Sequence, residues 1–131
     1  MKKSKADEYV KILGFVTDEE LDSLYKNSIA LVYPSLSEGF GLQGIEAMAS
    51  GTIVLMSGIN VFKEIYRDSV IYFDPKSVLD IKEKMKQAVN LDGTKRESMI
   101  ENGRKYIKEF SWSKMAEETM KEYGNIIKGS E

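Results

Sequence analysis

Short apolar runs alternate with helical patterns along most of this chain, and this alternation most limits the folds open to it. The run at residues 29–33 carries no charge and ends at Pro34. A continuous apolar run fits a strand that is buried on both faces, as in a parallel sheet with helices on either side. We therefore predict a three-layer α/β/α fold with a mostly parallel sheet of about four strands. The predicted strands are residues 9–16, 29–33, 52–56 and 70–73.

Signals for helix starts and stops separate these runs. Thr17 and Glu20 form a capping box, in which the threonine hydroxyl caps the first turn and the glutamate reaches back. Further helices are predicted through residues 45–49, ending at Gly51, and at residues 61–66. Two more begin at the capping pairs Ser77 with Asp80 and Thr94 with Glu97. A last helix follows Ser111, and in it we expect Trp112 and Tyr123 to pack against the sheet.

Composition narrows the classes of protein that the chain can represent. Its 131 residues favour one domain, and its net charge of −2 argues against a nucleic-acid binder driven by bulk charge. It has no cysteine and no histidine, so it offers no disulfide, no thiolate and no imidazole base or metal ligand. Its apolar runs are far shorter than the roughly 20 residues of a membrane span.

The residues best suited to bind a ligand lie just after the predicted strand at residues 29–33. Glu38 and Glu46 lie eight positions apart with a glycine turn between them. Ligands in parallel α/β sheets bind at the carboxyl ends of strands, which is where this segment falls. Gly39 and Gly41 let the backbone approach a phosphate, and the start of the following helix offers free N–H groups and a partial positive charge. Because a carboxylate can accept hydrogen bonds from a sugar diol, the pattern favours a sugar-nucleotide site.

The same stretch, from Glu38 to Thr52, resembles the Glu-x7-Glu signature of the retaining GT-B glycosyltransferases of group 1 (family 4). The resemblance covers nearly the whole chain in the same order, and implies the Rossmann-like C-terminal domain that binds the donor, truncated at its N-terminal side. The further matching segments are Asp18-Glu19-Glu20-Leu21 with Leu24-Tyr25, Tyr33-Pro34-Ser35, Glu64-Ile65, Phe73-Asp74-Pro75 and Phe110-Ser111-Trp112.

The resemblance implies a role for each part of the site. Glu38 would be the catalytic residue and hold hydroxyls of the donor sugar, and Glu46 would take the ribose hydroxyls. The base would lie near residues 14–16, with Phe15 and Val16 as binding residues. The turn would supply backbone contacts to the sugar and diphosphate from Gly39, Phe40, Gly41 and Leu42.

The resemblance also implies the reaction and its participants. A hexose would pass from a UDP-, GDP- or ADP-sugar to a glycan, a lipid-linked or another acceptor, with retention of configuration. No cofactor and no metal would be required, because protein groups stabilise the leaving diphosphate. Nucleic acid would not be a partner. We expect the chain in the cytoplasm, or peripheral at the inner face of the membrane.

Two parts of the family's pattern are missing from this sequence. They are the domain that binds the acceptor and two βα units whose Gly-Arg turn and lysine neutralise the diphosphate. We therefore interpret residues 1–131 as a single partial nucleotide-sugar-binding domain that is inactive alone. In the family's strand order, 3-2-1-4-5-6, the missing units separate residues 9–16 from the other strands. An unpaired edge is a liability, so we expect either rearranged pairing of that strand or association, by self-association or with a partner chain.

Other interpretations of the same residues stay open at this point. Glu38 also fits an acidic residue that favours a helix N-terminus, and Glu46 fits a solvated helix position. Gly39 and Gly41 are turn glycines under either interpretation. The alternative function is a non-catalytic α/β interaction or scaffold module. Affinity for a nucleoside diphosphate would separate this module from a donor-binding domain.

Overall fold

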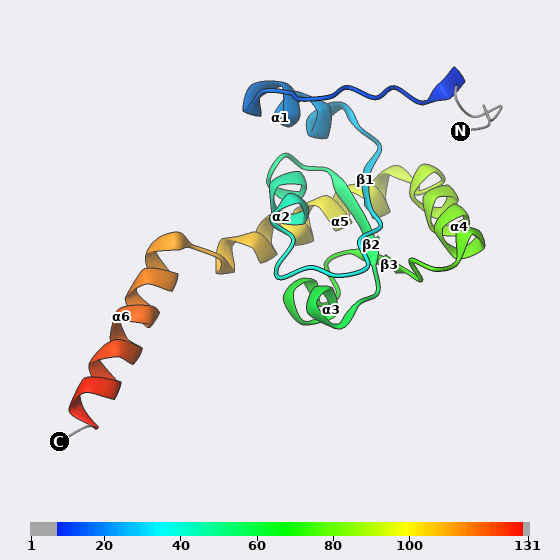
Figure 1. Ribbon diagram of the computed structural model, residues 1–131. Coiled ribbons are helices and arrows are strands. Elements are labelled where there is room, and N and C mark those ends of the chain that lie inside the picture. The colour runs from blue at the N-terminus through cyan, green and yellow to red at the C-terminus, as the bar shows by residue number, and fades with distance from the viewer. Residues whose placement is uncertain (1–7, 130–131) are drawn as a thin grey trace.

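A three-stranded parallel sheet forms the centre of the protein, and helices cover both of its faces (Figure 1). The computed structural model describes residues 8–129. Strands β1 (Ala30–Tyr33), β2 (Ile53–Ser57) and β3 (Ile71–Phe73) lie in the order β1-β2-β3, with Leu31 opposite Val54 and Leu55 opposite Ile71. The helices are α1 (Asp18–Asn27), α2 (Leu42–Ala49), α3 (Asn60–Tyr66), α4 (Val78–Val89), α5 (Gly93–Tyr106), the 3-10 turn η2 (Ile107–Glu109) and α6 (Trp112–Lys128).

The central strand β2 divides the core into two clusters. Successive side chains of a strand point to opposite faces, and all five residues of β2 are buried. Val54 and Met56 pack with buried residues of α1, α2 and α3, whereas Ile53 and Leu55 pack with residues of α4 and α5. The predicted three-layer α/β/α class is therefore confirmed. The strand β1 is only half-buried, unlike the prediction for residues 29–33, because it lies at the edge of the sheet.

The prediction of a first strand at residues 9–16 is wrong. This segment runs outside the sheet, past α1, and the side chains of Ile12 and Phe15 are each 94% exposed (Figure 1). Its sequence suits a strand, but a strand forms only where a neighbour can take up its backbone hydrogen bonds. Among residues 8–129, β1 pairs with β2 alone, so the rearranged pairing is not present and the sheet has three strands rather than about four.

Side-chain caps begin α1, α4 and α6 where the sequence predicts helix starts. In the α1 capping box, the Glu20 N–H donates to Thr17 Oγ1 at 3.3 Å and the Thr17 N–H donates to Glu20 Oε2 at 2.9 Å. Ser111 caps α6 by accepting from the Lys114 N–H at 3.4 Å. Gly51 follows α2 in the left-handed conformation, with φ of +83°. Local hydrogen-bonding patterns thus located these helix ends from sequence.

Two predicted capping pairs differ in the structure. Ser77 caps α4 by accepting from the Asp80 N–H at 3.2 Å, but the Asp80 carboxylate accepts from the Asp74 N–H instead of reaching back to Ser77. The predicted start at Thr94 is wrong, because Asp92 caps α5 and accepts from the Lys95 N–H at 2.9 Å. The Asp92 carboxylate lies two residues before Thr94 and accepts from an N–H group at the helix start that would otherwise lack a partner.

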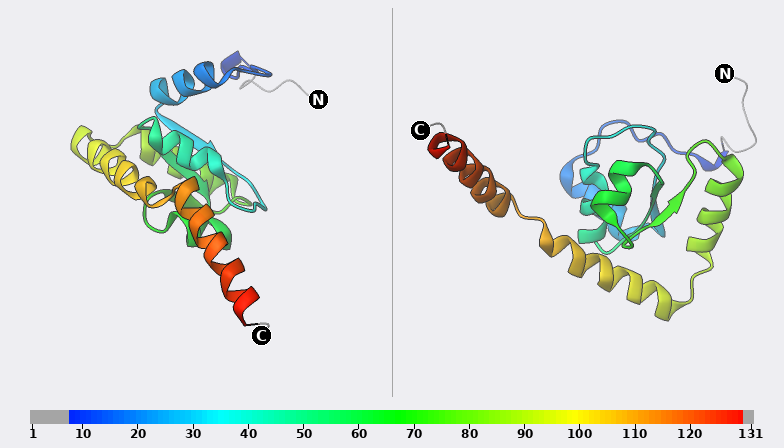
Figure 2. Two further views of the ribbon diagram at one scale, coloured as in Figure 1. Left: turned by 90° about the vertical axis from the view of Figure 1, so that its left-hand side faces the viewer. Right: turned by 90° about the horizontal axis from the view of Figure 1, so that it is seen from below.

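The last helix leaves the body of the protein (Figures 1 and 2). The expectation that Trp112 and Tyr123 pack against the sheet is wrong, since their side chains are 73% and 58% exposed. Helical spacing of apolar residues predicts a face that suits burial, but does not identify what covers it. Both faces of the sheet are already covered by other helices. None of the described helices, α6 included, is long and apolar enough to cross a membrane.

The approach of α2 to α3 is close enough to require a glycine. A β-carbon on Gly44 would lie 2.6 Å from the hydroxyl oxygen and 2.8 Å from a ring carbon of Tyr66, whose side chain is fully buried. We predict that Gly44→Ala lowers the free energy of unfolding by about 1–3 kcal/mol, the usual cost of overpacking. Urea denaturation measures this change. Gly93→Ala, where no atom lies within 4 Å, is the control and should change stability by less than about 0.5 kcal/mol. Equal effects of the two substitutions would contradict the packing argument.

Candidate functional site

A glycine turn joins β1 to α2 at the carboxyl end of the sheet. Gly41 caps α2 in the left-handed conformation, with φ of +88°. A β-carbon at this position would also lie 2.6 Å from the Phe62 ring. Gly39 has neither restriction, because it has no left-handed φ and open space around it. Of the two glycines in the predicted site, the fold therefore requires only Gly41 to be glycine.

Helix α3 packs against this turn and stabilises it. The Tyr66 hydroxyl donates a hydrogen bond to the Gly41 carbonyl, which also accepts from the Gly44 N–H at 3.0 Å. Burial raises the pKa of Tyr66 far above its ordinary value, so this hydroxyl stays protonated as a donor. The Phe62 ring lies 5.3 Å from the Tyr33 ring and 6.0 Å from the Tyr66 ring, centre to centre. The turn, the end of β1 and α3 therefore pack as one unit.

The first carboxylate of the motif is held by two hydroxyl groups. Glu38 Oε1 accepts from the Tyr33 hydroxyl at 2.7 Å and from Ser35 Oγ at 2.8 Å. These two hydrogen bonds, that of Tyr33 first, lower the pKa of Glu38 below its ordinary value, so the carboxylate is ionised at neutral pH. Burial, and after it the bond to Glu38, raises the pKa of Tyr33 to about 12. Neither Tyr33 nor Ser35 was predicted as a partner of Glu38, because no motif in the sequence links them to it.

The second carboxylate lies on the exposed side of α2, one turn into the helix. Glu46 lies next to Tyr25 of α1, whose pKa is raised by burial and then by the charge of Glu46 and a hydrogen bond to it. Glu46 lines an open hollow of about 360 Å³ between α1 and α2, together with Tyr25, Asp22 and Ser50. The Ser50 hydroxyl donates to Asp22 Oδ1 at 2.7 Å and thereby ties the two helices together.

The structure does not bring all the predicted site residues into one cavity. Glu38 lines a different hollow, of about 340 Å³, with residues 36–37 and 59–61 at the start of α3. The Phe40 ring contacts the Phe110 ring edge to face, 5.8 Å between centres, and Leu42 is 45% exposed at the start of α2. Neither hollow is lined by Phe15 or Val16, which lie in the segment outside the sheet.

The site therefore has two halves, one at the turn before α2 and one where the later part of α2 packs on α1. One half offers an oriented carboxylate beside a glycine turn, and the other offers a carboxylate beside a tyrosine hydroxyl. Between them, the free N–H groups at the start of α2 favour an anion. The described residues contain no group of three or more acidic, histidine or cysteine side chains that could hold a metal ion.

Comparison with known proteins identifies relatives over most of the chain. The family model described as "Glycosyl transferases group 1" matches residues 1–106. O-antigen chain mannosyltransferase B of Escherichia coli is 35% identical over 115 residues, which are 88% of this chain and 30% of that protein. Serotype-specific mannosyltransferase WbdA of Escherichia coli is 33% identical over 118 residues, 90% of this chain and 14% of that protein. This chain thus spans less than a third of the length of these relatives.

A solved structure confirms the architecture. Sucrose-phosphate synthase from Thermosynechococcus elongatus superimposes with a TM-score of 0.79 and 25% sequence identity. The match covers 95% of this chain and 33% of that chain. The arrangement of strands and helices described above is therefore that of one part of a protein about three times longer.

Proposed function

Because this chain belongs to the group 1 glycosyl transferases, we propose that it binds the nucleotide-diphosphate sugar donor of a retaining hexosyltransferase. The observation that carries the proposal is the glycine turn, which leads into the α2 N-terminus between Glu38 and Glu46. A helix N-terminus suits a diphosphate, and a carboxylate on each side suits the hydroxyl groups at the two ends of a nucleotide sugar.

In this proposal, each half of the site binds one end of the donor. Glu38 accepts hydrogen bonds from the sugar and acts as the catalytic residue, while the backbone of residues 39–42 contacts the sugar and the diphosphate. Glu46, beside Tyr25, accepts from the ribose hydroxyls. Phe15 and Val16 contact the base once their segment is held in a completed sheet. Protein groups rather than a metal ion or another cofactor stabilise the leaving diphosphate.

The names of the relatives indicate which sugar the donor carries. Two of the similar proteins bear the name mannosyltransferase, and one of them is named for the O-antigen chain. We therefore propose mannose as the sugar and a glycan, free or lipid-linked, as the acceptor. The acceptor binds to a part of the enzyme outside this chain, and the reaction takes place in the cytoplasm at or near the inner face of the membrane.

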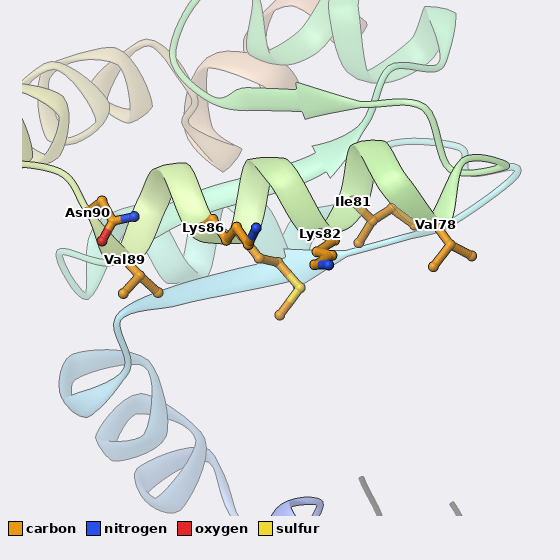
Figure 3. Close-up of a pocket in the computed structure, with 7 residues that line it drawn as sticks. Val78, Ile81, Lys82, Lys86, Val89 and Asn90 are labelled. Carbon is orange, nitrogen blue, oxygen red and sulfur yellow. The ribbon is translucent and has the colours of Figure 1, made fainter. Parts of the chain in front are cut away.

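A second proposal concerns what completes the sheet. The outer edge of β1 belongs to an uncharged run, residues 29–33, whereas exposed edges in natural proteins usually carry charges or are covered. Beside it, α4 exposes Val78 and Val89 at 79% and 59%. Figure 3 shows the residues that line an open groove of about 560 Å³ along this helix, Val78, Ile81, Lys82, Met85, Lys86, Val89 and Asn90. We propose that a further polypeptide supplies a strand to β1 and a helix to this groove.

The first prediction from the proposed function is nucleotide binding that depends on Glu46. Among UDP, GDP and ADP, one should bind the isolated chain saturably in calorimetry. Glu46→Ala should weaken that binding by about tenfold or more, because a hydrogen bond to a charged group contributes about 1.5–3 kcal/mol. Glu83→Ala, on the exposed side of α4, is the matched control and should bind like the unaltered chain. Equal affinity of the two variants would exclude the ribose role of Glu46.

The second prediction concerns turnover by the isolated chain. We expect no transfer and no donor hydrolysis with UDP-, GDP- or ADP-linked mannose, because the chain spans only 30% of its mannosyltransferase relative. A coupled assay for released nucleoside diphosphate measures this. A measurable initial rate would show that the chain is a complete enzyme and would overturn the proposal that it is one part.

The third prediction concerns the surface formed by β1 and α4. Without its partner polypeptide, the chain should self-associate through this surface, and light scattering at rising concentration should give a mass above that of a monomer. Val89→Lys, in the groove, should return the mass towards the monomer because it places a charge among apolar groups. Gln87→Lys adds the same charge on an exposed position of α4 outside the groove and should leave the association unchanged. A monomeric unaltered chain would contradict this prediction.

A further inference from the structure

The carboxylate of Glu38 presents only one of its oxygens to a ligand. Both the Tyr33 hydroxyl and the Ser35 hydroxyl donate to Oε1, at 2.7 and 2.8 Å. A carboxylate oxygen has two lone pairs, so these two bonds use the acceptor capacity of Oε1. Among residues 8–129, no group donates a hydrogen bond to Oε2. The oxygen Oε2 therefore keeps its acceptor capacity for a ligand.

We propose that Tyr33 and Ser35 are positioning residues, which fix the Glu38 carboxylate so that Oε2 alone accepts the hydroxyl groups of the donor sugar. The inference rests on the proposed function, and it adds how the site recognises the sugar. It assigns the expected contact with a sugar diol to a single carboxylate oxygen.

Tyr33 connects Glu38 to the rigid part of the fold. Its ring is half-buried at the end of β1 and packs against Phe62, which is fully buried in α3. The same Phe62 ring lies against Gly41. The carboxylate is therefore positioned by the sheet and α3, although Glu38 itself lies on a loop. A carboxylate that is already oriented loses less conformational freedom when a ligand binds.

The single proton of the Tyr33 hydroxyl has two neighbouring acceptors. Gln43 Oε1 lies at 3.1 Å and Glu38 Oε1 at 2.7 Å. The proton goes to Glu38, which is both nearer and charged, since hydrogen bonds to ionised acceptors are shorter and stronger. Burial and Glu38 together raise the pKa of Tyr33 to about 12, so the donor keeps its proton throughout the physiological range.

The test isolates the sugar's share of donor affinity. Calorimetry of the chain gives the affinity for a nucleoside diphosphate and for the matching diphosphate-linked mannose, and their ratio is the sugar increment. Tyr33→Phe and Ser35→Ala should each reduce this increment by about three- to tenfold, which corresponds to one hydrogen bond, while the affinity for the diphosphate stays unchanged. Ser35→Thr keeps the hydroxyl and should retain the increment.

A matched control removes a tyrosine hydroxyl elsewhere. Tyr106 is half-buried like Tyr33, and its hydroxyl donates to the Ile65 carbonyl, away from Glu38. Tyr106→Phe should leave the sugar increment unchanged, so a general loss of stability is separated from a loss of positioning.

A second readout needs no ligand. In the unaltered chain, the hydrogen bonds from Tyr33 and Ser35 hold the pKa of Glu38 below its ordinary value. Tyr33→Phe removes a donor that favours the charged form, so the pKa of Glu38 should rise in an NMR titration of its side-chain carboxyl carbon. The Tyr106→Phe variant should show no such rise.

Each outcome decides the proposal. A sugar increment that persists in Tyr33→Phe and Ser35→Ala, or a Glu38 pKa that does not move in Tyr33→Phe, overturns the positioning role while the proposed function stands. An unaltered chain that binds no diphosphate or shows no sugar increment overturns the proposed function, and the positioning role with it. A reduced increment together with a raised Glu38 pKa supports both.

Discussion

The contact between the start of α2 and the aromatic residues of α3 is the constraint on which the rest of the structure depends. Tyr66 contacts Gly44 and donates to the Gly41 carbonyl, while Phe62 occupies the space where a side chain at Gly41 would lie. This contact fixes the direction in which α2 starts and where the loop from β1 must arrive. The geometry of both carboxylates follows from it, because one precedes the turn and the other lies one helical turn beyond it.

Much of the fold follows from patterns that are local in the sequence. The three strands that formed lie where uncharged or apolar runs occur, and the capping box at Thr17 forms both of its hydrogen bonds. The larger errors arise where a pattern needs a distant partner. Residues 9–16 have the composition of a strand, yet no strand pairs with them in the described chain. The apolar positions of α6 are regular, yet nothing in the described chain buries them. A periodic pattern records that a face suits burial, whereas the partner is set by tertiary structure.

The position of the candidate segment in the fold was predictable, whereas the contacts of its side chains were not. The spacing of Glu38, Gly41 and Glu46 is a property of one segment, and the structure places this segment at the carboxyl end of the sheet as expected. The hydroxyl partners, Tyr33 and Ser35, were not predicted, because a strand position gives no sign of which acceptor its side chain will reach. That the two carboxylates line separate hollows depends on how α1 packs on α2, which no motif encodes.

The position of α6 has a consequence for the order in which the chain acquires its structure during synthesis. The core clusters draw their residues from the segment between α1 and η2, and α6 adds no buried residue to them. All the contacts that define the α/β core are therefore present once η2 has left the ribosome. The core can fold while α6 is still inside the exit tunnel, where its apolar stripe is shielded from other nascent chains. When α6 emerges, its apolar positions are exposed beside a body that is already structured.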